Sequence, residues 1–287
     1  MVLFRQVAAL SNLNPVESLL LSSRLAKIQN AVATKFQSTV GPPLFGADTD
    51  GATCSSKDVF IIFPGAGGRD ALSDELEESL RQSSSSDTAF VATFDWQEHR
   101  GTVLTAAYDS ETVGETVGKC LWEMMNSKSI AFRSIHCIGI SVGAFAANGL
   151  AREICSRRGS APSGDGEAAA PYVRLTLLAP FTSRGVTGQS YGPDNFGVTA
   201  DCAVQFMTND DPVPTTSKTL PACIRYDLSA SKTRNDFVLP EGESMHCWPV
   251  AYYARYGLDE ERKMFGDAFV RHGDGICLER GTVVKVV

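Results

Sequence analysis

The sequence has 287 residues but no C-x-x-C pair, only four histidines, and no apolar run of the length that crosses a bilayer, which is about 18 residues or more. We therefore expect no transmembrane segment. The eight cysteines are scattered without metal-site spacing, which argues against a zinc or dithiol centre, and we expect neither a metal nor an organic cofactor. A formal net charge of −7 at pH 7 argues against a nucleic-acid partner.

The composition is that of an ordinary globular protein, with 43% hydrophobic and 21% charged residues. The first 40 residues differ from the rest, since they carry four basic residues against one acidic residue. Apolar residues recur there at three- and four-residue steps, the pattern of an amphipathic helix: Leu21, Leu25, Ile28, Val32 and Phe36. Such a segment is typical of an organelle transit peptide, but it fits equally a helix that packs on the domain.

These observations divide the chain into a segment 1–40 and a single domain 41–287. A transit peptide at 1–40 would direct the protein to a mitochondrion or a chloroplast. A helix that packs on the domain would instead leave the protein in the cytoplasm.

Strand-like and helix-like stretches alternate after about residue 58. Short apolar runs predict strands at 59–63, 89–94, 135–140, 173–178, 202–207 and 224–228, the last being the final core strand. Helical patterns lie at 70–82, 111–127, 144–154, 248–256 and 258–271, and a low-complexity loop lies at 156–171. The alternation predicts an α/β fold with a mostly parallel, doubly wound sheet and helices on both faces. If the last two strands are neighbours, Cys202 and Cys223 could form a disulfide.

The stretch Gly139-Ile140-Ser141-Val142-Gly143 fits the pattern G-x-S-x-G between a predicted strand and a small-residue helix. A serine at such a sharp turn stands clear of the sheet, and flanking glycines remove the Cβ atoms that would clash there. We predict that Ser141 is a nucleophile. The alternative is an ordinary glycine-flanked turn.

A nucleophilic serine needs a histidine base, and His246 follows the final predicted core strand, where the order serine, acid, histidine places it. The other histidines are less well placed: His136 lies inside a strand, His99 in a charged loop before the serine, and His272 in a turn near the end. The alternative for His246 is a surface-loop histidine.

The histidine needs an orienting carboxylate, and the strand 202–207 leads into two of them. Asp211 begins an Asp-x-Val-Pro sequence, which we prefer, and Asp210 is the alternative acid. For the oxyanion we predict two backbone N–H donors, that of Val142 after the nucleophile and that of Ala66 in the glycine-rich turn 64–68. The turn lacks the Lys and Ser/Thr of a phosphate-binding P-loop.

Taken together these residues resemble the pancreatic-type lipase family of α/β-hydrolases, over about residues 60–256. The stretch 135–144 is similar to the family's strand and nucleophile elbow, and Phe94-Asp95-Trp96 followed by Tyr108 and Val113-Gly114 is similar to its D-W…Y…V-G segment. His246 with Tyr252-Tyr253 is similar to its histidine segment, although Pro249 replaces a serine. The resemblance implies an α/β-hydrolase fold and hydrolysis of acyl-lipid esters.

The sequence also departs from the family. Ile140 stands where the family has a histidine, Pro64-Gly65 stands for its His-Gly, and Ala179 stands where its acid would fall. The acid must therefore come from the next strand, which again indicates Asp210 or Asp211. The region 215–245 is short for the family's large lid, which favours a smaller or more polar acyl ester over a triglyceride.

The sequence thus predicts a serine hydrolase of the lipase or esterase type that cleaves carboxylic esters through Ser141, His246 and Asp211. Its partner would be a small acyl ester or a lipid, with peripheral membrane contact and the oligomeric state left open. Two alternatives remain. One is an acyl thioesterase, and the other is a hydrolase-like structural or interaction protein without turnover.

Overall fold

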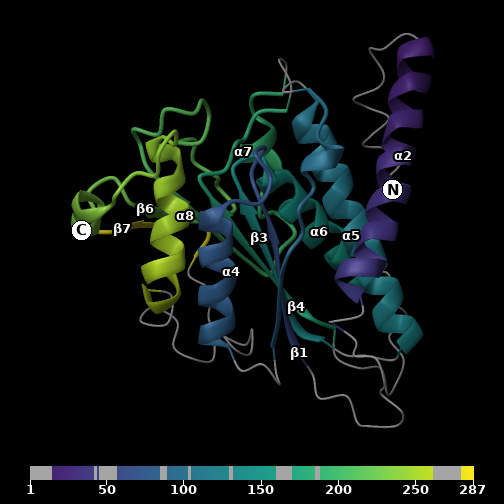
Figure 1. Ribbon diagram of the computed structural model, residues 1–287, viewed down its shortest axis with the longest axis horizontal. Coiled ribbons are helices and arrows are strands. Elements are labelled where there is room, and N and C mark those ends of the chain that lie inside the picture. The colour runs from purple at the N-terminus through teal and green to yellow at the C-terminus, as the bar shows by residue number, and fades with distance from the viewer. Residues whose placement is uncertain are drawn as a thin grey trace.

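A parallel β-sheet forms the centre of the computed structural model (Figure 1). The structure describes residues 15–41, 44, 57–84, 89–102, 105–128, 132–159, 170–184, 188–260 and 279–287. In these residues the sheet has seven strands in the order β2-β1-β3-β4-β5-β6-β7, and every neighbouring pair is parallel. The strands are β1 Lys57–Phe63, β2 Ala89–Thr93, β3 Phe132–Ile140, β4 Tyr172–Leu178, β5 Cys202–Met207, β6 Ile224–Asp227 and β7 Val283–Lys285. The predicted parallel sheet is confirmed.

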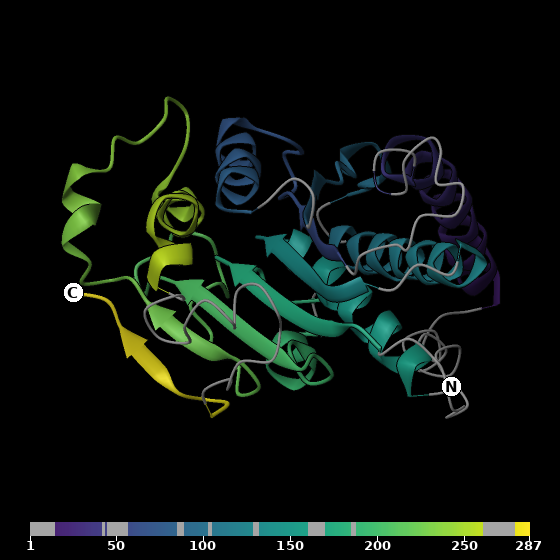
Figure 2. The ribbon, with the colours of Figure 1, turned by 90° about the horizontal axis from the view of Figure 1, so that it is seen from below.

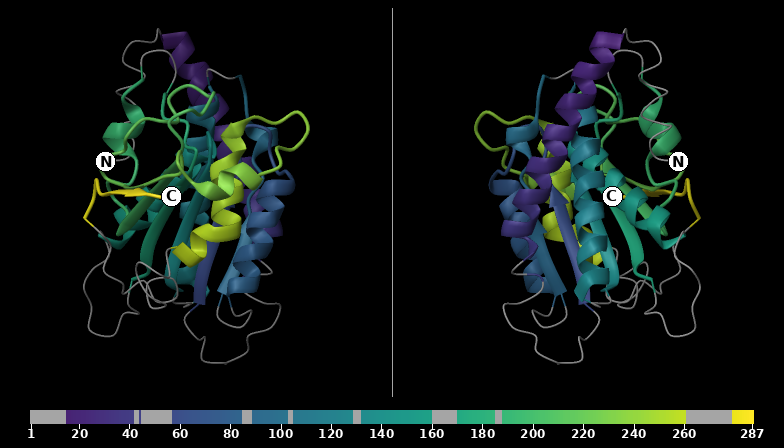
Figure 3. Two further views of the ribbon diagram at one scale, coloured as in Figure 1. Left: turned by 90° about the vertical axis from the view of Figure 1, so that its left-hand side faces the viewer. Right: turned by 90° about the vertical axis from the view of Figure 1, so that its right-hand side faces the viewer.

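Helices cover both faces of the sheet, as predicted (Figures 1 and 3). On one face lie α5 (Ala106–Lys128) and α6 (Gly143–Arg158), and α2 (Pro15–Thr39) packs beside α5. On the other face α4 (Ala71–Ser83) stands beside α8 (Trp248–Tyr252), which continues as the π-helical turn η4 (Tyr253–Gly257). None of the described helices is long and apolar enough to cross a membrane.

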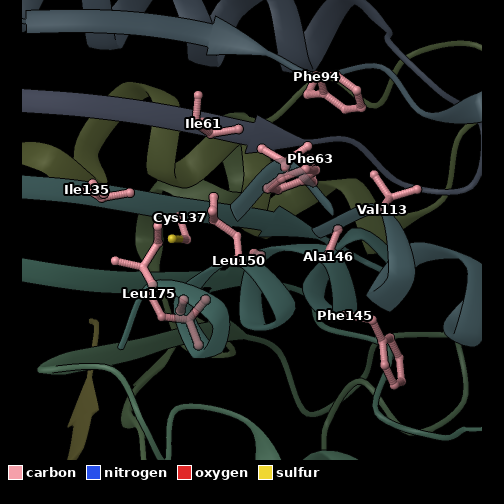
Figure 4. Packing of buried hydrophobic residues seen from close by; sticks show 14 of the residues in the cluster. Ile61, Phe63, Phe94, Val113, Ile135, Cys137, Phe145, Ala146, Leu150 and Leu175 are labelled. Atoms are coloured by element: carbon pink, nitrogen blue, oxygen red, sulfur yellow. The ribbon is translucent and has the colours of Figure 1, made fainter. Parts of the chain in front are cut away.

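The core consists of two apolar clusters separated by the sheet. Along β1, Ile61 and Phe63 point into the cluster under α5 and α6, whereas Phe60 and Ile62 point into the cluster under α4 and α8. Figure 4 shows the first cluster, which contains Ile61 and Phe63 of β1 together with helix residues such as Val113. A strand that is buried on both faces has apolar residues at successive positions, and this explains the uninterrupted apolar run at the end of β1.

The segment 1–40 contributes to the first cluster through α2. Ile28, Val32 and Phe36 are buried against the domain, one helical turn apart, as expected for an amphipathic helix. Arg24 also forms an ion pair of 2.7 Å with the buried side chain of Asp109 on α5. The helix therefore packs on the domain in this structure, and import into an organelle stays a prediction.

The structure differs from the predicted elements in several places. It adds a strand that was not predicted, β7, in which Val283 lies opposite Arg225 of β6. Because β7 is a largely exposed edge strand, the predicted strand at 224–228 remains the last core strand. The predicted helix 248–256 changes to π-helical geometry at Tyr253. The predicted helix at 258–271 lies largely outside the described residues. The predicted loop at 156–171 is partly wrong, because α6 continues to Arg158, and residues 160–169 lie outside the described residues.

Cys202 and Cys223, which could have paired if their strands were neighbours, form no disulfide with each other. The strands β5 and β6 are neighbours, but Val204 lies opposite Ile224. Since alternate residues of a strand face opposite sides, Cys202 points into the cluster under α4 and α8 and Cys223 into the other cluster. The sheet itself lies between the two sulfur atoms.

Candidate active site

The predicted nucleophile Ser141 occupies a strained turn between β3 and α6. Its φ is 53°, a left-handed value that costs a residue with a Cβ about 1–2 kcal/mol. Two backbone hydrogen bonds enforce the conformation: Ser141 donates its N–H to the Leu178 carbonyl at 3.0 Å, and Phe181 donates its N–H to the Ser141 carbonyl at 3.1 Å. Strain held in place by its surroundings is common at active sites.

The glycines of the motif are required by close backbone contacts. A Cβ on Gly139 would lie 2.6 Å from the Cα of Ala144, and a Cβ on Gly143 would lie 2.3 Å from the carbonyl oxygen of Phe63. Real Cβ atoms do not approach other atoms so closely, because van der Waals repulsion forbids contacts well below 3.0 Å. The two glycines therefore let the chain turn sharply and let α6 begin against the end of β1.

His246 and Asp211 form a direct hydrogen bond. His246 lies in the 3-10 turn η3 (Met245–Cys247), and its Nδ1 is 2.8 Å from Oδ2 of Asp211 in the loop after β5. The Asp211 side chain is 1% exposed and that of His246 is 19% exposed. The other carboxylate oxygen of Asp211 accepts the N–H of Val213 at 2.8 Å. Both carboxylate oxygens of Asp211 therefore have a hydrogen-bond partner, and these two bonds fix the orientation of the carboxylate.

The alternative acid, Asp210, points elsewhere. Its two carboxylate oxygens accept hydrogen bonds of 3.0 and 2.7 Å from Arg234, and its side chain is 59% exposed. The hydrogen bond from Arg234 lowers the pKa of Asp210, against the small opposing effect of burial. Of the two candidate acids, Asp211 is the one that contacts the histidine.

The second ring nitrogen of His246 is unengaged. Its Nε2 is buried and has no hydrogen-bond partner in the described part of the chain, so it makes no hydrogen bond to the Ser141 hydroxyl in this arrangement. Hydrogen bonds between a nucleophile and its base commonly tighten only when substrate is bound. Ser141, Asp211 and His246 follow β3, β5 and β6, and the carboxyl ends of parallel strands meet at one edge of the sheet (Figure 1).

The glycine-rich turn after β1 lies against the serine. A Cβ on Gly65 would sit 3.5 Å from the Cβ of Ser141, which places the backbone of the turn next to the nucleophile. The amides of Ala66 and Val142 donate no hydrogen bond to another described residue, so both can donate to a bound oxyanion. Their role in the oxyanion site stays a prediction.

The remaining residues weighed in the sequence lie away from the Asp211–His246 pair or outside the described part of the chain. Ala179, with φ of 45°, is buried directly after β4, at the position where the resemblance to pancreatic-type lipases would put an acid. His136 is buried inside the sheet, where it bonds the Thr176 hydroxyl at 2.7 Å, and His99 lies in the 3-10 turn η1 (Gln97–His99). His272 is outside the described residues. In the described part of the chain no cluster of His, Cys, Asp and Glu is arranged to hold a metal.

Sequence reasoning missed the threonine pair that joins the loops after β4 and β5. Thr182 donates its N–H to Oγ1 of Thr215 at 3.2 Å and its hydroxyl to the Thr215 carbonyl at 3.0 Å. Thr215 has φ of 71°, an unusual value for a β-branched residue. The pair joins the end of the loop that carries Asp211 to the loop after β4, which lies beside the turn at Ser141. In the sequence, only the prolines before Thr215 indicate this turn.

A strained serine between a parallel strand and a helix, with a paired acid and histidine after later strands of the same sheet, decides the fold type. The chain has the α/β-hydrolase fold. No family model matches the chain, and no curated protein matches its sequence. The special likeness to pancreatic-type lipases therefore stays a prediction.

Several solved α/β-hydrolase structures are similar in shape. A candidate carboxylesterase from Lactobacillus plantarum has a TM-score of 0.43 and 11% identity, covering 76% of this chain and 90% of its own. Esterase 2 from Thermogutta terrifontis has a TM-score of 0.39 and 13% identity, covering 75% and 86%. RedJ, the thioesterase of the prodiginine pathway in Streptomyces coelicolor, has a TM-score of 0.35 and 16% identity, covering 68% and 96%. Similarity at this level does not bear on substrate.

Proposed function

We propose that this α/β-hydrolase is a serine hydrolase that cleaves carboxylic esters, acyl-lipid esters foremost, through an acyl-enzyme. The observation that carries the proposal is the hydrogen bond of 2.8 Å between Nδ1 of His246 and Asp211 at the sheet edge that also holds the strained Ser141. An acid that fixes one ring nitrogen leaves the other nitrogen to act as a base.

In the proposed mechanism the hydroxyl oxygen of Ser141 attacks the ester carbonyl carbon, and its proton passes to Nε2 of His246. The π-electron pair of the carbonyl moves onto the carbonyl oxygen, which becomes an oxyanion. The N–H groups of Ala66 and Val142 would stabilise this oxyanion. The intermediate collapses, the C–O bond breaks, and His246 returns the proton to the leaving alcohol. Water then attacks the acyl-enzyme with His246 again as the base, releasing the acid and restoring Ser141.

Asp211 orients His246 throughout this cycle. Its carboxylate accepts the Nδ1 proton, which keeps the lone pair on Nε2, and it stabilises the imidazolium that forms in each half-reaction. The nearby thiol of Cys247 is not a competing nucleophile, because burial raises its pKa to about 11.

The test is hydrolysis of p-nitrophenyl esters of increasing acyl length, beside acyl thioesters followed by release of free thiol. We expect ester turnover in the wild type and a loss of at least about 10³-fold in Ser141→Ala, because the nucleophile is removed. Ser127→Ala, on the exposed side of α5, is the matched control and keeps full activity. Turnover of thioesters alone would favour the thioesterase alternative. An inactive wild type would favour the non-catalytic alternative.

A further inference from the structure

A buried tryptophan from the segment after β2 is bonded to the backbone of the glycine-rich turn. The indole Nε1 of Trp96 donates to the carbonyl of Pro64 at 2.9 Å, and Trp96 is 0% exposed. The sequence gives no sign of this contact, since the two residues are 32 positions apart. A buried carbonyl needs a partner, so the indole satisfies a group that the sheet leaves unpaired.

Trp96 lies in a segment that is closed by its own hydrogen bonds. The side chain of Asp95 accepts the N–H of Gln97 at 3.0 Å, and His99 donates its N–H to the Trp96 carbonyl at 2.8 Å, which closes the turn η1. From the same turn Arg100 reaches back and donates a hydrogen bond from Nη1 to the carbonyl of Ala66. The segment 95–100 therefore contacts the glycine-rich turn at two carbonyls.

These two carbonyls lie on either side of the predicted oxyanion donor. The N–H of Ala66 belongs to the peptide that joins it to Gly65, between the anchored carbonyls of Pro64 and Ala66. The carbonyl of that middle peptide accepts the N–H of Gly68 at 3.1 Å, inside the turn. Since the peptide is trans, its N–H points the opposite way, out of the turn.

Without these two hydrogen bonds the glycine-rich turn could adopt several backbone conformations, because glycine has few steric restrictions. A donor contributes to catalysis only if its direction is fixed before the charge develops. We propose that Trp96 is a positioning residue, which aims the Ala66 N–H at the oxyanion by holding the Pro64 carbonyl. The inference rests on the proposed function, since it presupposes a reaction at Ser141.

The helix α2 holds the outer side of the same segment. Lys35 donates to Glu98 at 2.8 Å, and the phenyl rings of Phe36 and Phe94 lie 6.4 Å apart between their centroids. Figure 2 shows α2 at the end of the molecule opposite β7. The strand β2, which precedes this segment, is the edge strand at the other end of the sheet from β7. The segment is thus confined between α2 and the turn that it anchors.

The experiment measures kcat, KM and inhibition by a trifluoromethyl ketone for wild type and Trp96→Phe. The Ser141 oxygen adds to the ketone carbon, its proton passes to His246, and the ketone oxygen becomes an oxyanion that uses the same N–H donors. We expect kcat to fall about 10- to 100-fold and the inhibition constant to rise by the same factor, with KM within about twofold, because one donor is misdirected but not removed. Trp122→Phe, on α5, is the matched control and leaves all three values unchanged.

The fraction of folded active sites is counted by stoichiometric labelling of Ser141 with a fluorophosphonate. Arg100→Met is a second, exposed variant that keeps the protein folded, and we expect a smaller loss, about 3- to 10-fold in kcat, with the same rise in the inhibition constant. Unchanged kcat and inhibition in Trp96→Phe would overturn the inference whatever the result for Arg100→Met, and so would losses in Trp96→Phe explained entirely by the labelled fraction. In either case ester turnover by the wild type would leave the proposed function standing. A wild type that neither turns over esters nor is labelled would refute the proposed function, and the inference with it.

Discussion

Two adjacent aspartates provide a matched pair of substitutions. Asp211→Asn removes the charge that contacts His246, whereas Asp210→Asn removes a charge paired with Arg234. Both changes are nearly isosteric, and both sites lie in one loop. The structure therefore predicts opposite outcomes for activity from two neighbouring and chemically identical replacements.

The expected size of the Asp211 effect follows from its burial. Two unit charges about 4 Å apart interact by about 4 kcal/mol at an effective dielectric constant of about 20, and this corresponds to about 10³-fold in rate. The nearly complete burial of Asp211 keeps solvent from screening this interaction. An asparagine also stabilises the wrong tautomer of His246, a replacement that costs about 10⁴-fold in serine proteases. We expect kcat to fall by about 10³- to 10⁴-fold.

For Asp210→Asn we expect kcat to change by less than about twofold, and the free energy of unfolding to fall by less than about 1 kcal/mol, since exposed ion pairs contribute little. The assay is the initial rate on the best p-nitrophenyl ester, with thermal unfolding of both variants as the check on folding. Equal losses in the two variants, or an Asp211→Asn enzyme within about tenfold of wild type, would refute the assignment of the acid.

Two further predictions concern the elbow and the sheet. Gly143→Ala forces a Cβ against the Phe63 carbonyl, so we expect the free energy of unfolding, measured by urea denaturation, to fall by about 1–3 kcal/mol. Gly67→Ala should change it by less than about 0.5 kcal/mol, because a Cβ there meets no described atom within 4 Å. Burial first, and then the charge of Arg174, lower the pKa of His136 well below its ordinary value, so the unfolded chain binds a proton that the folded chain does not. The folded chain therefore loses stability as the pH falls below about 6.5. Replacing His136 with Gln should reduce the loss of unfolding free energy between about pH 7.5 and about pH 5.5 by at most about 1.4 kcal/mol, the value for a ring that stays neutral in the folded chain. An unchanged pH dependence would contradict that reading.

The local parts of the site could be predicted from the sequence. The turn at Ser141 depends on glycines at 139 and 143 and on the elements that flank them, all within a few residues, so the pattern alone located the elbow. The alternating strands and helices predicted the parallel sheet for the same reason. Each β-α unit carries its own periodicity and turn residues.

The parts that depend on the direction of a side chain could not be predicted. Asp210 and Asp211 are neighbours in one turn and point in different directions, which no sequence pattern distinguishes. The register between β5 and β6 placed Cys202 and Cys223 on opposite faces, although the strands are adjacent as supposed. The strand β7 has only three residues, which is too short for a periodic signal.

Contacts between distant segments were equally hidden. The hydrogen bond from Trp96 to the Pro64 carbonyl joins two β-α connections, and its existence depends on the order of β1 and β2 in the sheet. The ion pair of Arg24 with Asp109 spans 85 positions. Such contacts follow from the assembled fold and not from any local pattern.

The most direct test of the account is covalent labelling of the purified protein with a fluorophosphonate, followed by mass spectrometry of the proteolytic peptides. The account predicts one adduct per chain, on Ser141, formed slowly or not at all in the His246→Ala variant, because the serine then lacks its base. An unlabelled wild type, or an adduct on a different residue, would contradict the claim that this turn holds an activated nucleophile.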